Sequence, residues 1–210
     1  MMDEITAVDG APLAPESVRM LDYLKTRAAE MSAPEIRARI QSAAEELEKT
    51  VVAVSPSEAR LRPIAGKWNI AEVVDHIAQT QARGAEELRH LLVGRRPPLP
   101  PVYEGLLSGA SQWAPLELLI EDLRGANRAM LEVLESLSDE LLTGVPPTVR
   151  TLIVALRKFE DGRTEAQLFF AELGWKEYAL LQRLHLLDHR RQVKELQAAA
   201  VASGMKGTCA

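Results

Sequence analysis

The sequence predicts an all-α protein, a four-helix bundle preceded by a shorter lead-in helix. Apolar residues recur at spacings of three and four over most of the chain, and the interruptions coincide with clusters of proline and glycine. The composition is typical of a folded chain, because 47% of the 210 residues are hydrophobic and 26% are charged. At a prior of roughly 150 residues per domain, this length predicts one domain with some additional chain.

The lead-in helix is expected from about Pro15 to Met31, where apolar residues lie three positions apart. Residues 1–31 are therefore expected to form an N-terminal arm with this helix, 32–200 the bundle, and 201–210 a flexible tail.

The first bundle helix should begin at Ser32, which suits an N-cap because Pro34 and Glu35 follow in the first turn. Its apolar stripe continues to about Val54. The serines and proline that begin at Ser55 then end the helix.

The second helix should start near Trp68 or Asn69 and run to about Val93, where the run GRRPPLPP prevents further helix. A third helix is expected after Pro115, and its apolar pattern fades after Leu137.

The fourth helix is expected over roughly Ala171 to Ala200, after a long connection. Within that connection Thr151 to Phe159 form an apolar run with β propensity, and the pattern does not distinguish a strand from a buried extended segment.

Charge and cysteine content exclude several classes of protein. Thirty acidic against 25 basic residues give a net charge of −5, which argues against nucleic acid as a partner. The lone cysteine, Cys209, cannot form an internal disulfide, which fits the cytoplasm. The N-terminus is acidic where a secretory signal is basic, and no apolar run approaches the roughly 18 residues that cross a bilayer, so we expect no membrane partner.

Three histidines form a candidate metal site. His185 and His189 are four residues apart, so a helix places both rings on one face, although this spacing alone is a weak motif. His76 lies at the edge of the apolar stripe of the second helix, where a side chain reaches an inner cleft and still meets solvent. Three neutral ring nitrogens leave coordination positions open, as in catalytic metal sites.

Two segments resemble the signature segments of the DinB/YfiT-like superfamily of bacterial four-helix-bundle metalloproteins: RPIAGKWNIAEVVDHIAQTQ (62–81) and HLLDHRRQ (185–192). In that family a Trp near the start of helix two precedes a metal-binding His, and an HxxxH pair with a Gln three residues later lies in helix four. The matching positions in this sequence are Trp68, His76, His185, His189 and Gln192.

The resemblance implies a DinB-like bundle that holds a divalent metal, most often zinc or nickel, on His76, His185 and His189. It also implies a small-molecule substrate. Part of the family transfers groups to or from a low-molecular-weight thiol such as bacillithiol or mycothiol, and other members are described as metal-dependent hydrolases.

Three polar side chains near the histidines are further candidates for the chemistry. Glu72, one turn before His76, could orient a ligand or act as a base, and Gln192 could hydrogen-bond a water on the metal. Asp188 is an outer hydrogen-bond partner or a solvated residue. Each has an ordinary alternative as a surface or polar helix residue.

The string HLLDH approximates the HxxEH pattern of inverted zincins, with Asp188 in place of the glutamate. Such peptidases take a further carboxylate from well downstream, and only Glu195 is available, which argues against a peptidase.

Three functions remain. Thiol-dependent S-transfer or isomerisation leads on family analogy, and metal-dependent hydrolysis of a small ester or amide is the alternative. The third is a non-enzymatic bundle that binds a metal or ligand and forms a homodimer through the outer leucines of the last helix.

Overall fold

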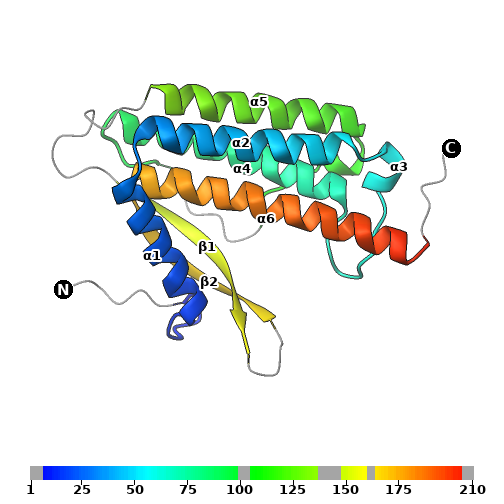
Figure 1. The fold of residues 1–210 in the computed structure, drawn as a ribbon, viewed down its shortest axis with the longest axis horizontal. Helices are drawn as coiled ribbons and strands as arrows, with labels where there is room; N and C mark the ends of the chain where they lie inside the picture. The colour runs from blue at the N-terminus through cyan, green and yellow to red at the C-terminus, as the bar shows by residue number, and fades with distance from the viewer. Residues whose placement is uncertain (1–6, 99–104, 137–147, 160–163, 205–210) are drawn as a thin grey trace.

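A computed structural model describes residues 7–98, 105–136, 148–159 and 164–204, and this part of the chain is mostly helical (Figure 1). The bundle consists of the four long helices α2 (Ala33–Val52), α4 (Ile70–Leu92), α5 (Leu116–Glu135) and α6 (Trp175–Ala202). Both α2 and α4 pack against α5 and α6, so the four helices form a ring around one core. The four-helix bundle predicted from periodicity is present.

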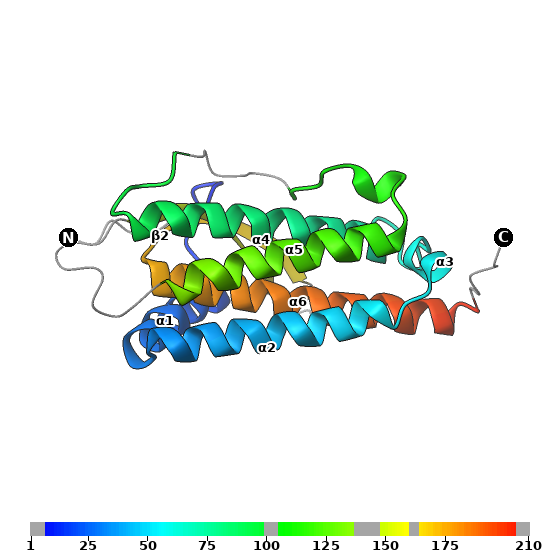
Figure 2. The ribbon, with the colours of Figure 1, turned by 90° about the horizontal axis from the view of Figure 1, so that it is seen from above.

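The helix directions differ from a simple up-and-down bundle. Helices α2 and α6 run one way and α4 and α5 run the other way, as the colour order in Figures 1 and 2 shows. Consecutive helices α4 and α5 are therefore parallel, and the chain between them must return along the bundle. This connection contains the 3₁₀ helix η1 (Ala110–Gln112) and contributes to the site described below.

Side-chain caps fix two helix starts close to their predicted positions. The backbone N–H and the hydroxyl of Ser32 both donate to the Glu35 carboxylate, at 2.8 Å. At α4, Asn69 Oδ1 accepts from the Glu72 N–H at 2.9 Å, and the Glu72 carboxylate accepts from the Asn69 N–H at 2.8 Å. Both are capping boxes, which satisfy N–H groups that a helix start leaves unpaired. The short helix α3 (Pro56–Ala59) follows α2 and begins at Ser55 in the same way.

The prediction of a purely all-α fold was wrong for the chain between α5 and α6. Strand β1 (Val149–Lys158) pairs antiparallel with β2 (Thr164–Leu173), with Val149 opposite Leu173. The β-prone run is thus a strand. The predicted start of the last helix at Ala171 was also wrong, since α6 begins at Trp175. Strand β2 contains alanine, leucine and glutamate, which favour helices, and only its pairing with β1 overrides that preference.

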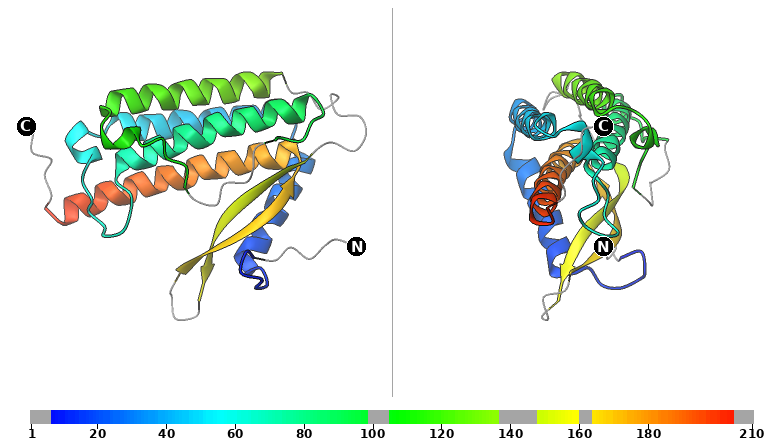
Figure 3. Two further views of the ribbon diagram at one scale, coloured as in Figure 1. Left: turned by 180° about the vertical axis from the view of Figure 1, so that it is seen from behind. Right: turned by 90° about the vertical axis from the view of Figure 1, so that its right-hand side faces the viewer.

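The hairpin buries one face against helix α1 (Pro15–Glu30), and α1 also packs against α6. Together they lie on one side of the bundle (Figure 3). The buried face carries alternate residues of both strands, Val149, Ile153, Phe169 and Leu173. The opposite face of β1 is therefore directed away from this contact.

Gln167 of β2 joins the hairpin to the start of α1. Its side-chain oxygen accepts from the Ala14 N–H and from the Ser17 hydroxyl, both at 2.8 Å. Its amide nitrogen donates to the Pro12 carbonyl at 3.1 Å. Because Gln167 and Ser17 are both buried, these bonds fix α1 on the sheet.

The leucines on the outer face of the last helix are used inside the chain. Leu180 is buried, and Leu187 packs against the core. Leu187 remains partly exposed, so only Leu180 is fully buried inside the chain, and the homodimer stays a prediction.

No helix in the described ranges combines the length and the apolar character needed to cross a membrane. The predicted end of the third helix beyond Leu137 falls outside the described residues, as do the last six residues of the predicted tail.

Candidate metal centre

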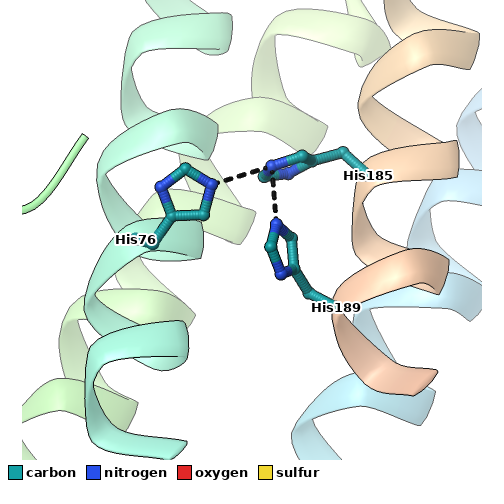
Figure 4. A group of neighbouring side chains, drawn as sticks. All are labelled: His76, His185 and His189. Atoms are coloured by element: carbon teal, nitrogen blue, oxygen red, sulfur yellow. Dashed lines mark hydrogen bonds between the residues drawn. The ribbon is translucent and has the colours of Figure 1, made fainter. Parts of the chain in front are cut away.

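His76 from α4 and His185 and His189 from α6 point toward one another across the bundle (Figure 4). The Nε2 atom of His185 lies 3.0 Å from Nε2 of His76 and 3.0 Å from Nε2 of His189. The ring centroids are 4.3 to 5.0 Å apart. The four-residue spacing on α6 and the antiparallel course of α4 thus bring three ring nitrogens within 4.8 Å of one another.

The cluster is more enclosed than the sequence indicated. His76 was expected at an edge that still meets solvent, but it is only 8% exposed, and the Trp68 ring packs on it at 4.8 Å between centroids. Burial is the main cause that lowers the pKa of all three rings, and the neighbouring histidines lower the pKa of His185 and His189 further. The pKa of His185 lies well below 6.5, and that of His189 is lowered to about 4. All three rings are therefore neutral at pH 7, the state that ligates metals.

Hydrogen bonds to the outer nitrogens orient two of the rings. Nδ1 of His76 donates to the Leu106 carbonyl at 2.9 Å, and Nδ1 of His189 donates to Gln192 Oε1 at 2.7 Å. In a neutral ring a proton on Nδ1 leaves the lone pair on Nε2. Both Nε2 lone pairs therefore face the centre of the cluster. Nδ1 of His185 is buried and has no hydrogen-bond partner among the described residues.

The donor set fits a divalent transition-metal ion. With metal–nitrogen bonds of about 2.0–2.1 Å, two ligating nitrogens lie about 2.9 Å apart at a right angle and about 3.3 Å apart at the tetrahedral angle. The two separations of 3.0 Å that involve His185 fall in this range, and all three ligand atoms lie within 4.8 Å of one another. His76 and His189 both present an Nε2 lone pair to His185, and a single Nε2–H of His185 cannot fully satisfy two acceptors, whereas a cation would bind both lone pairs.

The three rings open on a cavity of about 730 Å³, within the usual range of small-molecule sites. Its wall is largely apolar and comes from α4, α6, β1 and the connection before η1, with Trp68, Leu106, Leu152, Val154, Leu181 and Leu184 among the lining residues. Strand β1 therefore contributes the face that it does not bury against α1.

One end of the cavity is polar. There the Glu87 carboxylate accepts from the buried Tyr178 hydroxyl and from Arg83 Nε, the latter at 2.9 Å. Burial, with the Glu87 charge next, raises the pKa of Tyr178 well above 10, so its hydroxyl keeps its proton. Glu87 is eleven residues beyond His76 on α4, so roughly 16 Å of helix separate Glu87 from His76. The cavity is elongated along the groove between α4 and α6.

The other predicted residues have different surroundings. Gln192 contacts His189 directly. Glu72 belongs to the cap of α4, and its second oxygen pairs with Arg62 at 2.6 Å. Asp188 lines the cavity, but its side chain is 65% exposed and pairs with Arg191 at 2.7 Å.

Sequence reasoning missed the Leu106 carbonyl and the wall from β1. A backbone acceptor has no residue-type signal, and the position of β1 depends on contacts between distant segments.

Comparisons with known proteins agree with this fold. Residues 39–193 match the family model of the DinB superfamily. A crystal structure of a histidine-to-alanine mutant of a mycothiol-dependent maleylpyruvate isomerase shares the fold with a TM-score of 0.52, at 10% sequence identity. The match covers 79% of this chain and 62% of the isomerase chain. No curated protein matches the sequence significantly.

Proposed function

Since the chain belongs to the DinB superfamily, we propose that it is a metal-dependent enzyme that acts on a small molecule and uses a low-molecular-weight thiol for S-transfer or isomerisation. The observation that carries the proposal is that three ring nitrogens lie close together on the wall of a cavity of about 730 Å³. His76, His185 and His189 are the proposed ligands, and zinc or nickel is the proposed ion. When bound, such an ion acts as a Lewis acid and lowers the pKa of a thiol or water that reaches it.

The chain's own residues have three tasks in this proposal. The Leu106 carbonyl and Gln192 hold His76 and His189 with their Nε2 atoms toward the ion. The apolar wall excludes water from the reacting groups. The polar end with Arg83, Glu87 and Tyr178 contacts the distal part of an elongated substrate. Glu72 and Asp188 receive no chemical role, because Arg62 and Arg191 engage their carboxylates.

The surroundings of the histidines favour a thiol over water as the nucleophile. No carboxylate in the described part of the chain is hydrogen-bonded to any of the three rings. A free thiol has a pKa of about 8.5, against about 15.7 for water, so it needs far less help to lose its proton. The mycothiol dependence given for the isomerase of similar fold supports the same choice.

The first test is elemental analysis of the purified wild-type chain and of His185→Ala after incubation with zinc or nickel and desalting. We expect about one ion per wild-type chain and none in the variant, because a two-histidine site holds a divalent ion weakly. His90→Ala, which removes a histidine near the other end of α4, is the matched control and should keep the ion. A wild-type chain that takes up neither metal refutes the proposal.

The second test separates the reactions. The metal-loaded protein is incubated with monochlorobimane and with mycothiol, bacillithiol or glutathione, and the amount of S-conjugate is measured. The same reaction with the His185→Ala variant in place of the wild-type protein gives the background. Conjugate above this background supports thiol transfer. Metal-dependent cleavage of small esters without any conjugate would support a hydrolase. If neither reaction is detected, the non-enzymatic metal-binding bundle is the function that remains.

A further inference from the structure

Residues 105–111, the part of the α4–α5 connection that leads into η1, are attached to α4 at two adjacent positions. The Leu106 carbonyl accepts from Nδ1 of His76. Asp75, the preceding residue on α4, accepts from the Ser108 hydroxyl at 2.7 Å, the Ser108 N–H at 3.2 Å and the Ser111 N–H at 3.4 Å. The segment is thus bonded both to a proposed metal ligand and to the neighbour of that ligand.

Asp75 is an unusual residue for its position. It is 2% exposed, and a buried carboxylate is costly unless hydrogen bonds or charges compensate it. Ser108 and Ser111 supply this compensation through their hydrogen bonds to the Asp75 carboxylate. An apolar residue would pack the same helix face without that cost, so Asp75 serves the connection rather than the core.

The segment also contacts the Trp68 ring, which packs on His76. A Cβ atom on Gly105 would lie 2.5 Å from the Trp68 ring, closer than any real contact, so only glycine lets the backbone approach this ring. Trp68 in turn packs on His76. His76 is therefore held between the Trp68 ring and the Leu106 carbonyl, and residues 105–111 contact both.

We propose that Asp75 is a positioning residue that anchors residues 105–111, so that the Leu106 carbonyl keeps the proton of His76 on Nδ1 and leaves Nε2 free toward His185 and His189. Adjacent helix residues project about 100° apart, so one side chain can bind the connection while the next enters the cavity. The effect on the tautomer does not depend on any metal. The effect on metal binding rests on the proposed function.

The first experiment measures the tautomer of His76 in metal-free protein, from the ¹⁵N shifts of the imidazole nitrogens, with His76→Gln to assign the signals. We expect the Nδ1–H form in the wild type. In Asp75→Ala the proton should redistribute toward Nε2, because the anchored carbonyl is lost. The matched control is Glu87→Gln, which also removes a buried carboxylate from α4 but has no bond to residues 105–111. This control should keep the wild-type tautomer.

The second experiment measures zinc affinity by competition with a chromogenic chelator. Loss of an outer hydrogen-bond partner of a ligating histidine weakens metal binding about 10- to 100-fold. We expect that loss in Asp75→Ala, a smaller one in Asp75→Asn, which keeps one acceptor oxygen, and wild-type affinity in Glu87→Gln. Should Asp75→Ala fail to fold, Ser108→Ala changes an exposed residue instead: it removes the 2.7 Å bond to Asp75 and the 3.1 Å bond that the Ala110 N–H donates to the same hydroxyl, and it should show a weaker change in the same direction.

The outcomes are distinguishable. A wild-type chain without zinc affinity refutes the proposed function and leaves the tautomer measurement as the test of Asp75. Wild-type zinc affinity together with an unchanged tautomer in Asp75→Ala overturns the role of Asp75 and leaves the metal site intact. An equal loss of affinity in Glu87→Gln also overturns it, because the effect would then follow from stability alone.

Discussion

The metal-free protein should lose stability as the pH falls below about 6.5, because its clustered histidines are held neutral in the folded state. Burial, with a smaller contribution from His76, lowers the pKa of His189 from 6.5 to about 4. The same ring in the unfolded chain takes up its proton near its ordinary pKa. Between these two values the unfolded state binds more protons than the folded state, so the free energy of unfolding decreases as the pH decreases.

The expected magnitude follows from these two pKa values. At pH 7.5 the His189 ring is neutral in both states, so its titration changes the free energy of unfolding by almost nothing. At pH 5 the ring is mostly protonated in the unfolded chain and mostly neutral in the folded one, which lowers the free energy of unfolding by about 2 kcal/mol. His185 acts in the same direction, since burial, and then His189 and His76, lower its pKa well below 6.5.

Urea unfolding in the presence of EDTA, followed by circular dichroism at pH 7.5 and pH 5, measures this loss in the wild type and in His189→Gln. The difference at pH 7.5 gives the packing cost of the substitution. The further difference at pH 5 reports the titration. The wild type should lose about 2 kcal/mol more than the variant between the two pH values. An equal loss in both proteins would refute the assignment of a neutral, buried His189.

Three substitutions and one exposed control test the hydrogen bonds and the core packing around the site. Gln167→Leu leaves the Ala14 N–H and the Ser17 hydroxyl without their acceptor, so it should cost about 2–3 kcal/mol and speed amide exchange in α1; unchanged exchange there would contradict the proposed link. Tyr178→Phe removes the donor to the buried Glu87 carboxylate and should cost about 1.5–3 kcal/mol in urea unfolding, whereas a neutral effect would show that the bond contributes nothing. Leu123→Ala at a fully buried position of α5 should cost about 2–5 kcal/mol, and Leu118→Ala, 54% exposed on the same helix, should stay within about 0.5 kcal/mol.

The features that could be predicted from sequence are those that depend on short spacings. The pair His185 and His189 shares a helix face because one turn spans 3.6 residues, whatever the rest of the chain does. The capping residues Ser32 and Asn69 mark helix starts for the same reason, since a cap acts over three residues. The family resemblance then linked His76 to this pair over more than a hundred residues, and the structure brings the three rings together.

The features that could not be predicted depend on contacts between distant segments. Strand β2 has a local preference for helix, and its partner β1 supplies the hydrogen bonds that make it a strand. The enclosure of His76 depends on Trp68 and on a backbone carbonyl from the connection after α4. Glu72 had the right distance along the helix to assist His76, but capping its own helix and pairing with Arg62 occupy its carboxylate.

The proposed metal ligands and part of the cavity wall come from different parts of the fold, and this difference has a functional consequence. The proposed ligands stand on two packed helices, whose mutual position is fixed by the core. Part of the cavity wall that a substrate would meet comes instead from β1, from Met20 of α1 and from residues 105–106. These segments lie outside the four-helix core, so substitutions on their cavity side can change the shape of the cavity at little cost to the fold. If the proposed function holds, exchanging Leu152 or Val154 should therefore change which substrates are accepted while the metal affinity stays the same, and a loss of metal would show that the wall and the ligand site are mechanically coupled.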